Sequence, residues 1–203
     1  MPALLNGLLF GLVFIFAIGP SFFLLIQNSI EYGFKKGALI AVGISLSDIL
    51  FVSITLLGLS TIISDPENAT LFSYIAASIL AVFGIYSFFK KPVINNEETI
   101  KNGRGTIRFI AKGFLINIFN PTIILFWITL SSTISTSYDY TWTEKRSFFI
   151  GLLITILSSD LLKAYLANNV RSMITIRSIK VFNQIVGSIL VIFAISLIYK
   201  LGA

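Results

Sequence analysis

Two aspartates, Asp48 and Asp160, lie deep inside long apolar stretches, and each directly follows a serine. An ionised carboxylate at the centre of a bilayer costs about 3 kcal/mol or more, so it must face a wet cavity, pair with a cation or take up a proton. A single buried aspartate could merely fix helix packing through hydrogen bonds to small neighbours. Two in matching contexts indicate a polar site that binds a coupling proton or a substrate ammonium group.

Two earlier apolar stretches are interrupted by proline, at Gly19-Pro20 and at Asn120-Pro121. Proline removes a helical N–H donor and clashes with the carbonyl one turn earlier. A break of this kind leaves a helix N-terminus inside the membrane, and its free N–H groups attract a carboxylate. An ordinary proline kink is the alternative. Asn117 shares a helix face with Asn120 and adds amide donors and acceptors, so we predict that these five residues bind substrate.

Three further polar residues lie near these positions. Lys163 follows Asp160 by three residues and therefore shares its helix face. It could neutralise Asp160, or it could extend to the cytoplasmic surface, and we favour the second arrangement. Gln27 and Asn28 are expected near the cytoplasmic end of their helix, where water solvates them easily, so they are weaker candidates for the site.

The composition is that of a membrane protein. The 203 residues are 56% hydrophobic and only 12% charged, whereas soluble proteins carry roughly 25% charged residues. The chain has no cysteine and no histidine, which excludes disulfides, thiol redox chemistry and imidazole metal sites. We expect no cofactor and no resident metal. The pI of 9.6 follows from basic cytoplasmic loops, so nucleic acid is not an expected partner.

The apolar stretches predict an all-α, polytopic membrane protein with six transmembrane helices, because helices satisfy every backbone group in lipid. We treat residues 1–203 as a single membrane domain, with three-helix halves at 1–89 and 110–203 and a polar cytoplasmic linker at 90–109. The predicted helical segments are 3–27, 37–63, 69–89, 110–135, 147–168 and 181–200.

Basic residues predict the orientation of these helices. Eleven of the fifteen lysines and arginines fall in or beside the loops after the first, third and fifth segments, and three fall on the opposite side. Positively charged loops remain in the cytoplasm. Both termini should therefore lie outside the cytoplasm.

The order of features repeats between the two halves. Each has a broken first helix, then basic residues, then a helix that contains Ser-Asp. Because three segments precede the linker, the halves enter the membrane from opposite sides. An inverted 3+3 repeat with broken helices 1 and 4 is an architecture of secondary transporters. The alternative is that apolar helices resemble one another without any repeat.

Two stretches carry a resemblance to a known family. The first runs from Gly19-Pro20 through Gln27-Asn28, the loop 32–37 and Gly43 to Asp48; the second is Gly113–Pro121. Together they resemble the lysine exporter (LysE/RhtB-type) family of bacterial amino-acid translocators. The resemblance implies six helices, location in the bacterial inner membrane, and export of amino acids or related zwitterions coupled to protons. Members often have lysine after Asn-Pro, where this chain has Thr122, so a contact made by that lysine is not expected here.

We therefore expect an exporter of amino acids or similar small metabolites that works by alternating access, and not an enzyme. Its partners would be an amino-acid substrate, H⁺ and the lipid bilayer, and the chain could also form a homodimer. Two alternatives remain at this point. Two acidic residues with asparagine and backbone oxygens could carry a divalent cation such as Mn²⁺. Two intramembrane aspartates could also form an aspartyl protease dyad, although both follow serine here, whereas that class shows Tyr-Asp and Gly-x-Gly-Asp.

Overall fold

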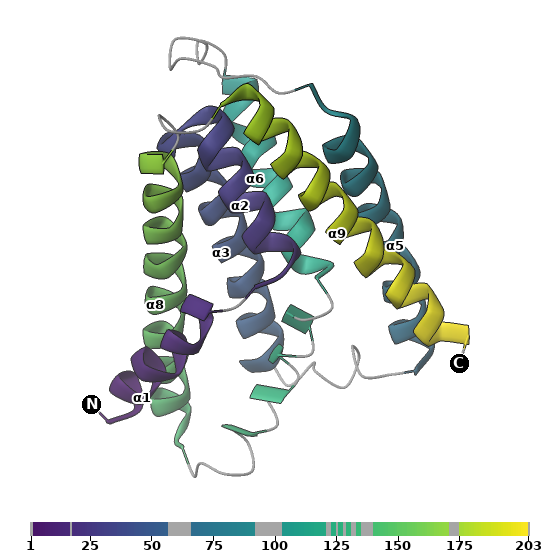
Figure 1. Ribbon diagram of the computed structural model, residues 1–203. Helices are drawn as coiled ribbons and strands as arrows, with labels where there is room; N and C mark the ends of the chain where they lie inside the picture. Colours follow the sequence, from purple (N-terminus) through teal and green to yellow (C-terminus); the bar gives the residue numbers. More distant parts are fainter. Residues whose placement is uncertain are drawn as a thin grey trace.

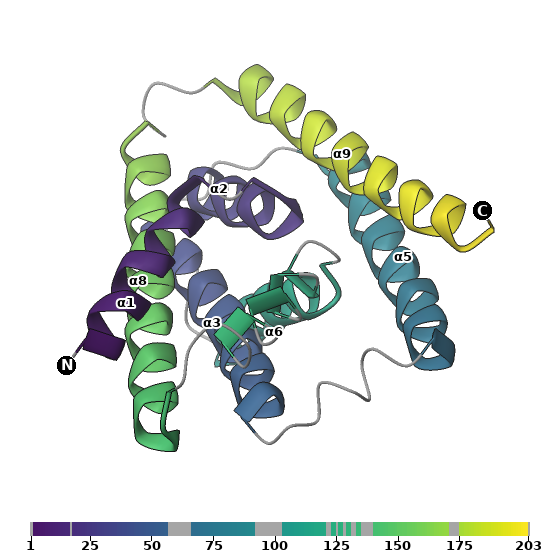
Figure 2. The same cartoon turned by 90° about the horizontal axis from the view of Figure 1, so that it is seen from below.

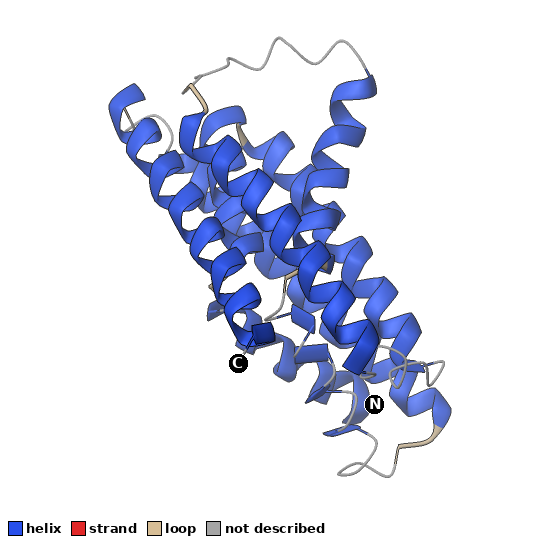
Figure 3. Cartoon of the chain, turned by 90° about the vertical axis from the view of Figure 1, so that its right-hand side faces the viewer, coloured by secondary structure: helices blue, strands red, loops and turns tan. Residues whose placement is uncertain are grey.

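All regular structure in the described residues is helical, which confirms the predicted all-α class (Figures 1 and 3). The computed structural model describes residues 2–16, 18–56, 66–91, 103–120, 123–124, 126–127, 129–130, 133–134, 140–170 and 175–202. The helices are α1 (Pro2–Gly11), the 3-10 helix η1 (Leu12–Phe16), α2 (Pro20–Tyr32), α3 (Phe34–Leu56), α5 (Pro66–Phe89), α6 (Gly103–Ile118), α8 (Trp142–Asn169) and α9 (Ile176–Gly202).

Several of these helices are long and apolar enough to cross a membrane. By length and composition α3, α8 and α9 qualify singly, and the helices at Pro2–Ile15 and Pro20–Tyr32 qualify together as one span bent by 72°. Their outward faces carry large apolar side chains, such as Ile192 and Ile195 of α9, which are 63% and 61% exposed. Such faces suit lipid rather than water. The chain is a multi-pass membrane protein.

Several predicted helix boundaries differ from the structure, two of them beside basic residues. The predicted loop before residue 37 shrinks to Gly33, whose φ of 83° glycine adopts without strain, and α3 begins directly after it. Lys36 therefore lies in the first turn of α3 and is 8% exposed, rather than in a loop. Helix α6 begins at Gly103, well before the predicted start at residue 110, so the polar linker is shorter than expected.

The helices associate mainly in three pairs, α3 with α6, α8 with α1, and α5 with α9. Figure 2 shows the α5 and α9 pair on one side of the bundle and the α1 and α8 pair on the other, with α2, α3 and α6 between them. Each pair has glycines from both helices where the backbones meet, and an added Cβ would overlap the partner helix. These glycines are Gly43 with Gly113, Gly7 with Gly151, and Gly84 with Gly187.

Candidate functional site

The first apolar stretch is broken at Gly19-Pro20, as predicted. Helix η1 ends at Phe16, and α2 begins at Pro20, whose fixed φ suits the first position of a helix. Gly19 is extended, with φ −171° and ψ −173°, and its carbonyl accepts from Phe23 N at 3.1 Å. Glycine has no side chain to cap the helix, so the first N–H groups of α2 remain available to a ligand.

A second break lies at Asn120, as predicted. Helix α6 ends at Ile118, and Asn120 N donates to Asn117 O at 3.1 Å. The chain is helical at Ile123 and Ile124, whose backbone N–H groups each donate to Asn120 O at 3.0 Å. Pro121, the fifth predicted substrate-binding residue, lies outside the described residues.

The two breaks meet in space. A Cβ placed on Gly19 would lie 3.5 Å from Asn120 Nδ2. Asn120 Nδ2 in turn donates to Ser21 Oγ at 3.2 Å. The side chain at the second break therefore forms a hydrogen bond with the first turn of α2, which follows the first break. Residues about a hundred positions apart in sequence thus form one polar site.

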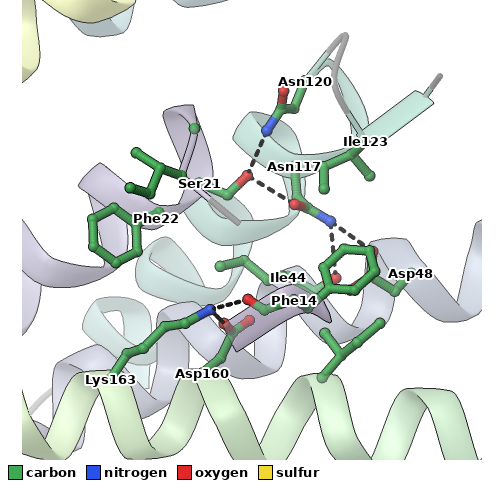
Figure 4. A pocket seen from close by; sticks show the side chains of 13 residues that line it. Phe14, Ser21, Phe22, Ile44, Asp48, Asn117, Asn120, Ile123, Asp160 and Lys163 are labelled. Carbon is green, nitrogen blue, oxygen red and sulfur yellow. Dashed lines mark hydrogen bonds and ion pairs between the residues drawn. The ribbon is translucent and has the colours of Figure 1, made fainter. Parts of the chain in front are cut away.

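A chain of hydrogen bonds leads from the breaks to Asp48 (Figure 4). Ser21 Oγ donates to Asn117 Oδ1 at 2.8 Å, and Asn117 Nδ2 donates to Asp48 Oδ1 at 2.9 Å. The indole Nε1 of Trp127 also donates to Asp48 Oδ1, at 3.3 Å. Asp48 is 2% exposed, and its donors among the described residues are neutral. The partners of this carboxyl group in the described part of the chain are therefore dipoles and not a cation.

Asp160 faces the same site with a different partner. Lys163 Nζ lies 3.0 Å from Asp160 Oδ1 and donates to Phe14 O at 2.8 Å (Figure 4). Our expectation that Lys163 would extend to the cytoplasmic surface was wrong. The carbonyl of Phe14 lies near the end of η1, where carbonyls lack helical partners, and together with Asp160 it holds the ammonium inside the bundle.

These groups surround a small cavity of about 50 Å³. That volume holds a few water molecules, and it is far below the roughly 300 Å³ of an ordinary small-molecule pocket. Of the predicted site residues, Gly19, Asp48, Asn117, Asn120 and Asp160 line it, while Pro20 is buried at the start of α2 without being among the lining residues. The remaining lining residues are Phe14, Ile18, Ser21, Phe22, Ile44, Ile123, Ile156 and Lys163.

The sequence analysis missed Ser21 and Trp127. Ser21 could have been found, because it lies in the first helical turn after Gly19-Pro20. Trp127 carries no such signal, since it lies in an apolar stretch and only its contact with Asp48 distinguishes it from a core residue.

A second buried polar cluster was also missed, and it corrects our expectation for Gln27 and Asn28. Both are buried, at 2% and 1% exposed, rather than solvated. Gln27 Nε2 donates to Asn183 Oδ1 at 3.0 Å, and Asn183 donates to Glu31, which also pairs with Lys90. Burial opposes the charged form of Lys90, but the Glu31 carboxylate outweighs it and raises the pKa of Lys90. This cluster links α2 to α9 and to the end of α5.

Comparison with known proteins gives a family match over most of the chain. Residues 12–201 match the family described as LysE type translocator. YcgF of Bacillus subtilis, named as a candidate amino acid efflux protein, is 25% identical over 198 residues, which cover 95% of this chain and 93% of the relative. The uncharacterized membrane protein YahN of Escherichia coli is 24% identical over 185 residues, covering 90% of this chain and 82% of YahN.

A leucine efflux protein of Klebsiella pneumoniae is 24% identical over 123 residues, which cover 60% of this chain and 58% of that protein. No solved structure matches. The matched family is one of translocators, and two of these relatives are named as efflux proteins rather than enzymes, which removes the intramembrane protease alternative. With a family match that spans nearly its whole length, the chain belongs to the LysE type translocator family.

Proposed function

We propose that this protein exports amino acids or similar small zwitterionic metabolites across the bacterial inner membrane. The observation that carries the proposal is the meeting of two helix breaks, at Gly19 and Asn120, beside the buried carboxylate of Asp48. A zwitterion presents one carboxylate and one ammonium group, and this site offers a partner for each. The names of two relatives, which refer to amino acid and leucine efflux, support the same substrate class.

The substrate carboxylate would bind at the first turn of α2. Its partners there are the N–H groups after Gly19-Pro20 and the amides of Asn117 and Asn120. Helix N-termini are suited to this task because their N–H groups and dipole both favour a negative charge.

The substrate ammonium and the coupling proton would use Asp48. This carboxylate lines the cavity, and no described residue gives it a cationic partner, so an ammonium group or a proton can neutralise it. Asp160 would contribute less directly, because Lys163 already neutralises it. Asp48 would then bind substrate from one side of the membrane and H⁺ from the other, in alternation. Alternate binding to one carboxylate gives antiport.

Alternating access is supported by the near-symmetry of the helix pairs. Helix α3 packs on α6 much as α8 packs on α1, each time with glycines at the contact, and Gly19 and Asn120 occupy corresponding breaks. We propose that residues 1–89 and 110–203 are inverted halves that rock about the central site, with both termini outside the cytoplasm. The cavity of about 50 Å³ would enlarge when either side opens.

The divalent-cation alternative receives less support from the arrangement of donors. Both carboxylates accept hydrogen bonds from N–H groups, and Asp160 is paired with an ammonium group. A hard cation requires oxygen ligands that converge on one point, and it would be repelled by Lys163. Among the described residues, no group of three or more acidic side chains forms such a set.

The test is uptake into inverted membrane vesicles under an imposed pH gradient, with a panel of amino acids and divalent cations. We expect gradient-driven accumulation of one or more amino acids, lost when the gradient is collapsed with an uncoupler. Vesicles from cells that lack the protein are the control. Accumulation of a divalent cation without any amino acid would overturn the proposal.

A further inference from the structure

Side chains of α3 and α6 line an apolar groove of about 320 Å³. These two helices lie side by side (Figure 2). The lining residues of the groove are Leu46 from α3 and Ile107, Ile110, Ala111, Phe114 and Leu115 from α6. Ile107 is 69% exposed and Leu46 is 46% exposed, so the groove opens outward. In a membrane it faces the hydrocarbon, and its length along α6, about 12 Å, suits part of an acyl chain.

Two basic side chains border the groove on the same helix. Arg108 directly follows Ile107, and Lys112 directly follows Ala111, so each lies about 100° around α6 from a lining residue. Lys112 Nζ lies 5.6 Å from the centroid of the Tyr86 ring, which directs it toward α5. Because α6 begins at Gly103, Arg108 is within about two turns of the helix start, at the depth of lipid headgroups.

Basic side chains outnumber acidic ones at this place among the described residues. There, Lys112 has Arg108 and Lys90 as like-charged neighbours and Glu31 as an opposing one. Glu31 is already engaged, with Lys90 on one carboxylate oxygen and Asn183 on the other. Among the described residues, neither Arg108 nor Lys112 forms an ion pair. An anion bound between them would relieve this repulsion.

We propose that the α3–α6 groove and the adjoining Arg108 and Lys112 bind one anionic phospholipid, with an acyl chain in the groove and the phosphate on the two cations. Basic side chains between helices on the cytoplasmic side recognise anionic headgroups, and the apolar groove favours a lipid over a soluble phosphate. The site is separate from the central cavity, and the proposal requires only that the chain spans a membrane. It does not depend on which substrate is exported.

The test is thermal unfolding of the purified full-length protein in a neutral detergent, titrated with three probes. These are dioleoyl phosphatidylglycerol, dioleoyl phosphatidylcholine and glycerol 3-phosphate. Phosphatidylglycerol should raise the melting temperature at the lowest concentration, phosphatidylcholine only at a higher one, and glycerol 3-phosphate not at all. Equal potency of the two lipids, or stabilisation by glycerol 3-phosphate alone, would overturn the proposal.

Four variants separate the headgroup contact from the groove. Arg108→Gln and Lys112→Gln should each raise the half-saturating phosphatidylglycerol concentration about fivefold, since one basic residue near the membrane surface contributes about that factor. Lys112→Arg should bind like the unmodified chain. Ala111→Phe fills the groove without altering charge and should weaken both lipids.

The matched control is Arg146→Gln, which removes an exposed charge from the first turns of α8. It should leave both lipid titrations unchanged. Each variant is compared with its own melting temperature in detergent alone, so a loss of stability is distinguished from a loss of lipid binding. Unchanged phosphatidylglycerol binding in both Arg108→Gln and Lys112→Gln, or in Ala111→Phe, would contradict the proposal.

Discussion

Asp48 and Asp160 have the same local sequence but different surroundings. Each follows a serine, each is buried, and each lines the central cavity. Asp48 receives hydrogen bonds from two neutral donors, whereas Asp160 forms an ion pair with Lys163. In the described part of the chain, one carboxyl group therefore has no cationic partner, and the other belongs to an ion pair. The comparison shows that a shared motif does not give the two carboxylates one role.

The difference originates one helical turn further along the chain. The residue three positions after Asp160 is Lys163, and the residue three positions after Asp48 is Phe51. Lysine at this spacing supplies a cation on the same helix face. Phe51 instead stacks on Trp127, with ring centroids 6.3 Å apart, and Trp127 donates to Asp48. The stacked Phe51 and Trp127 rings thus lie beside Asp48, whereas the Lys163 ammonium group lies beside Asp160.

The largest expected effect separates the two carboxylates directly. Asp48→Asn should lower amino-acid transport at least about 100-fold, equivalent to about 2.7 kcal/mol, because it removes the carboxyl group that would bind the substrate ammonium or the proton. Asp160→Asn should lower it clearly less. Initial rates of uptake into inverted vesicles measure both, normalised to the amount of folded protein. Equal losses in the two variants would show that the carboxylates act as one unit.

The ion pair can be broken on one side and then removed entirely. Lys163→Met leaves Asp160 unpaired beside the cavity, and it should lower the free energy of unfolding by about 2 kcal/mol. This loss is smaller than the loss from breaking a fully buried ion pair, because the pair lies beside the cavity. The double variant Asp160→Asn with Lys163→Met should recover most of that loss, because no lone charge remains. Thermal unfolding in detergent measures both. If the double variant is no more stable than Lys163→Met, the pair is not acting as a neutral unit.

Trp127→Phe tests whether the indole N–H tunes Asp48. The variant retains an aromatic ring against Phe51 but loses the donor, and transport should fall about tenfold, as for the loss of one hydrogen bond to a charged group. Trp142→Phe is the matched control, because Trp142 is 54% exposed at the start of α8. Trp127→Phe should also shift the pH dependence of transport, whereas a purely structural role would change the rate at every pH alike.

The smallest expected difference concerns the serines before the two aspartates. Ser47 Oγ accepts from Asn117 Nδ2, whereas Ser159 Oγ is buried and has no hydrogen-bond partner among the described residues. Ser47→Ala should therefore lower the free energy of unfolding by about 1 kcal/mol, and Ser159→Ala should be neutral or slightly stabilising. Melting temperatures measured side by side decide this. A larger loss of stability in Ser159→Ala than in Ser47→Ala would contradict this prediction.

Some of the site followed from residue types alone. The breaks at Gly19 and Asn120 were predicted because proline and glycine disrupt a helix wherever they occur, and both breaks were found. The two aspartates were singled out because charge is rare in apolar stretches. These are local or compositional properties, so no knowledge of neighbouring helices is needed to detect them.

Other features depend on contacts between distant segments. Lys163 can reach either the surface or Asp160, and the carbonyl of Phe14 on another helix decides between them. Gln27 was expected to be solvated and Glu31 was missed, because their partner Asn183 lies about 150 residues away in sequence. The periodicity of one helix shows which residues share a face, but not which helix covers that face.

The sequence by itself therefore determined that this chain is a helical membrane protein with two broken helices and two costly carboxylates, because backbone sterics and the cost of charge in lipid act residue by residue. Only the tertiary structure decided that the breaks meet, that Trp127 bonds Asp48 and that Lys163 neutralises Asp160. The physical reason is that hydrogen bonds and ion pairs act over about 3 Å, and helix packing alone brings these groups that close.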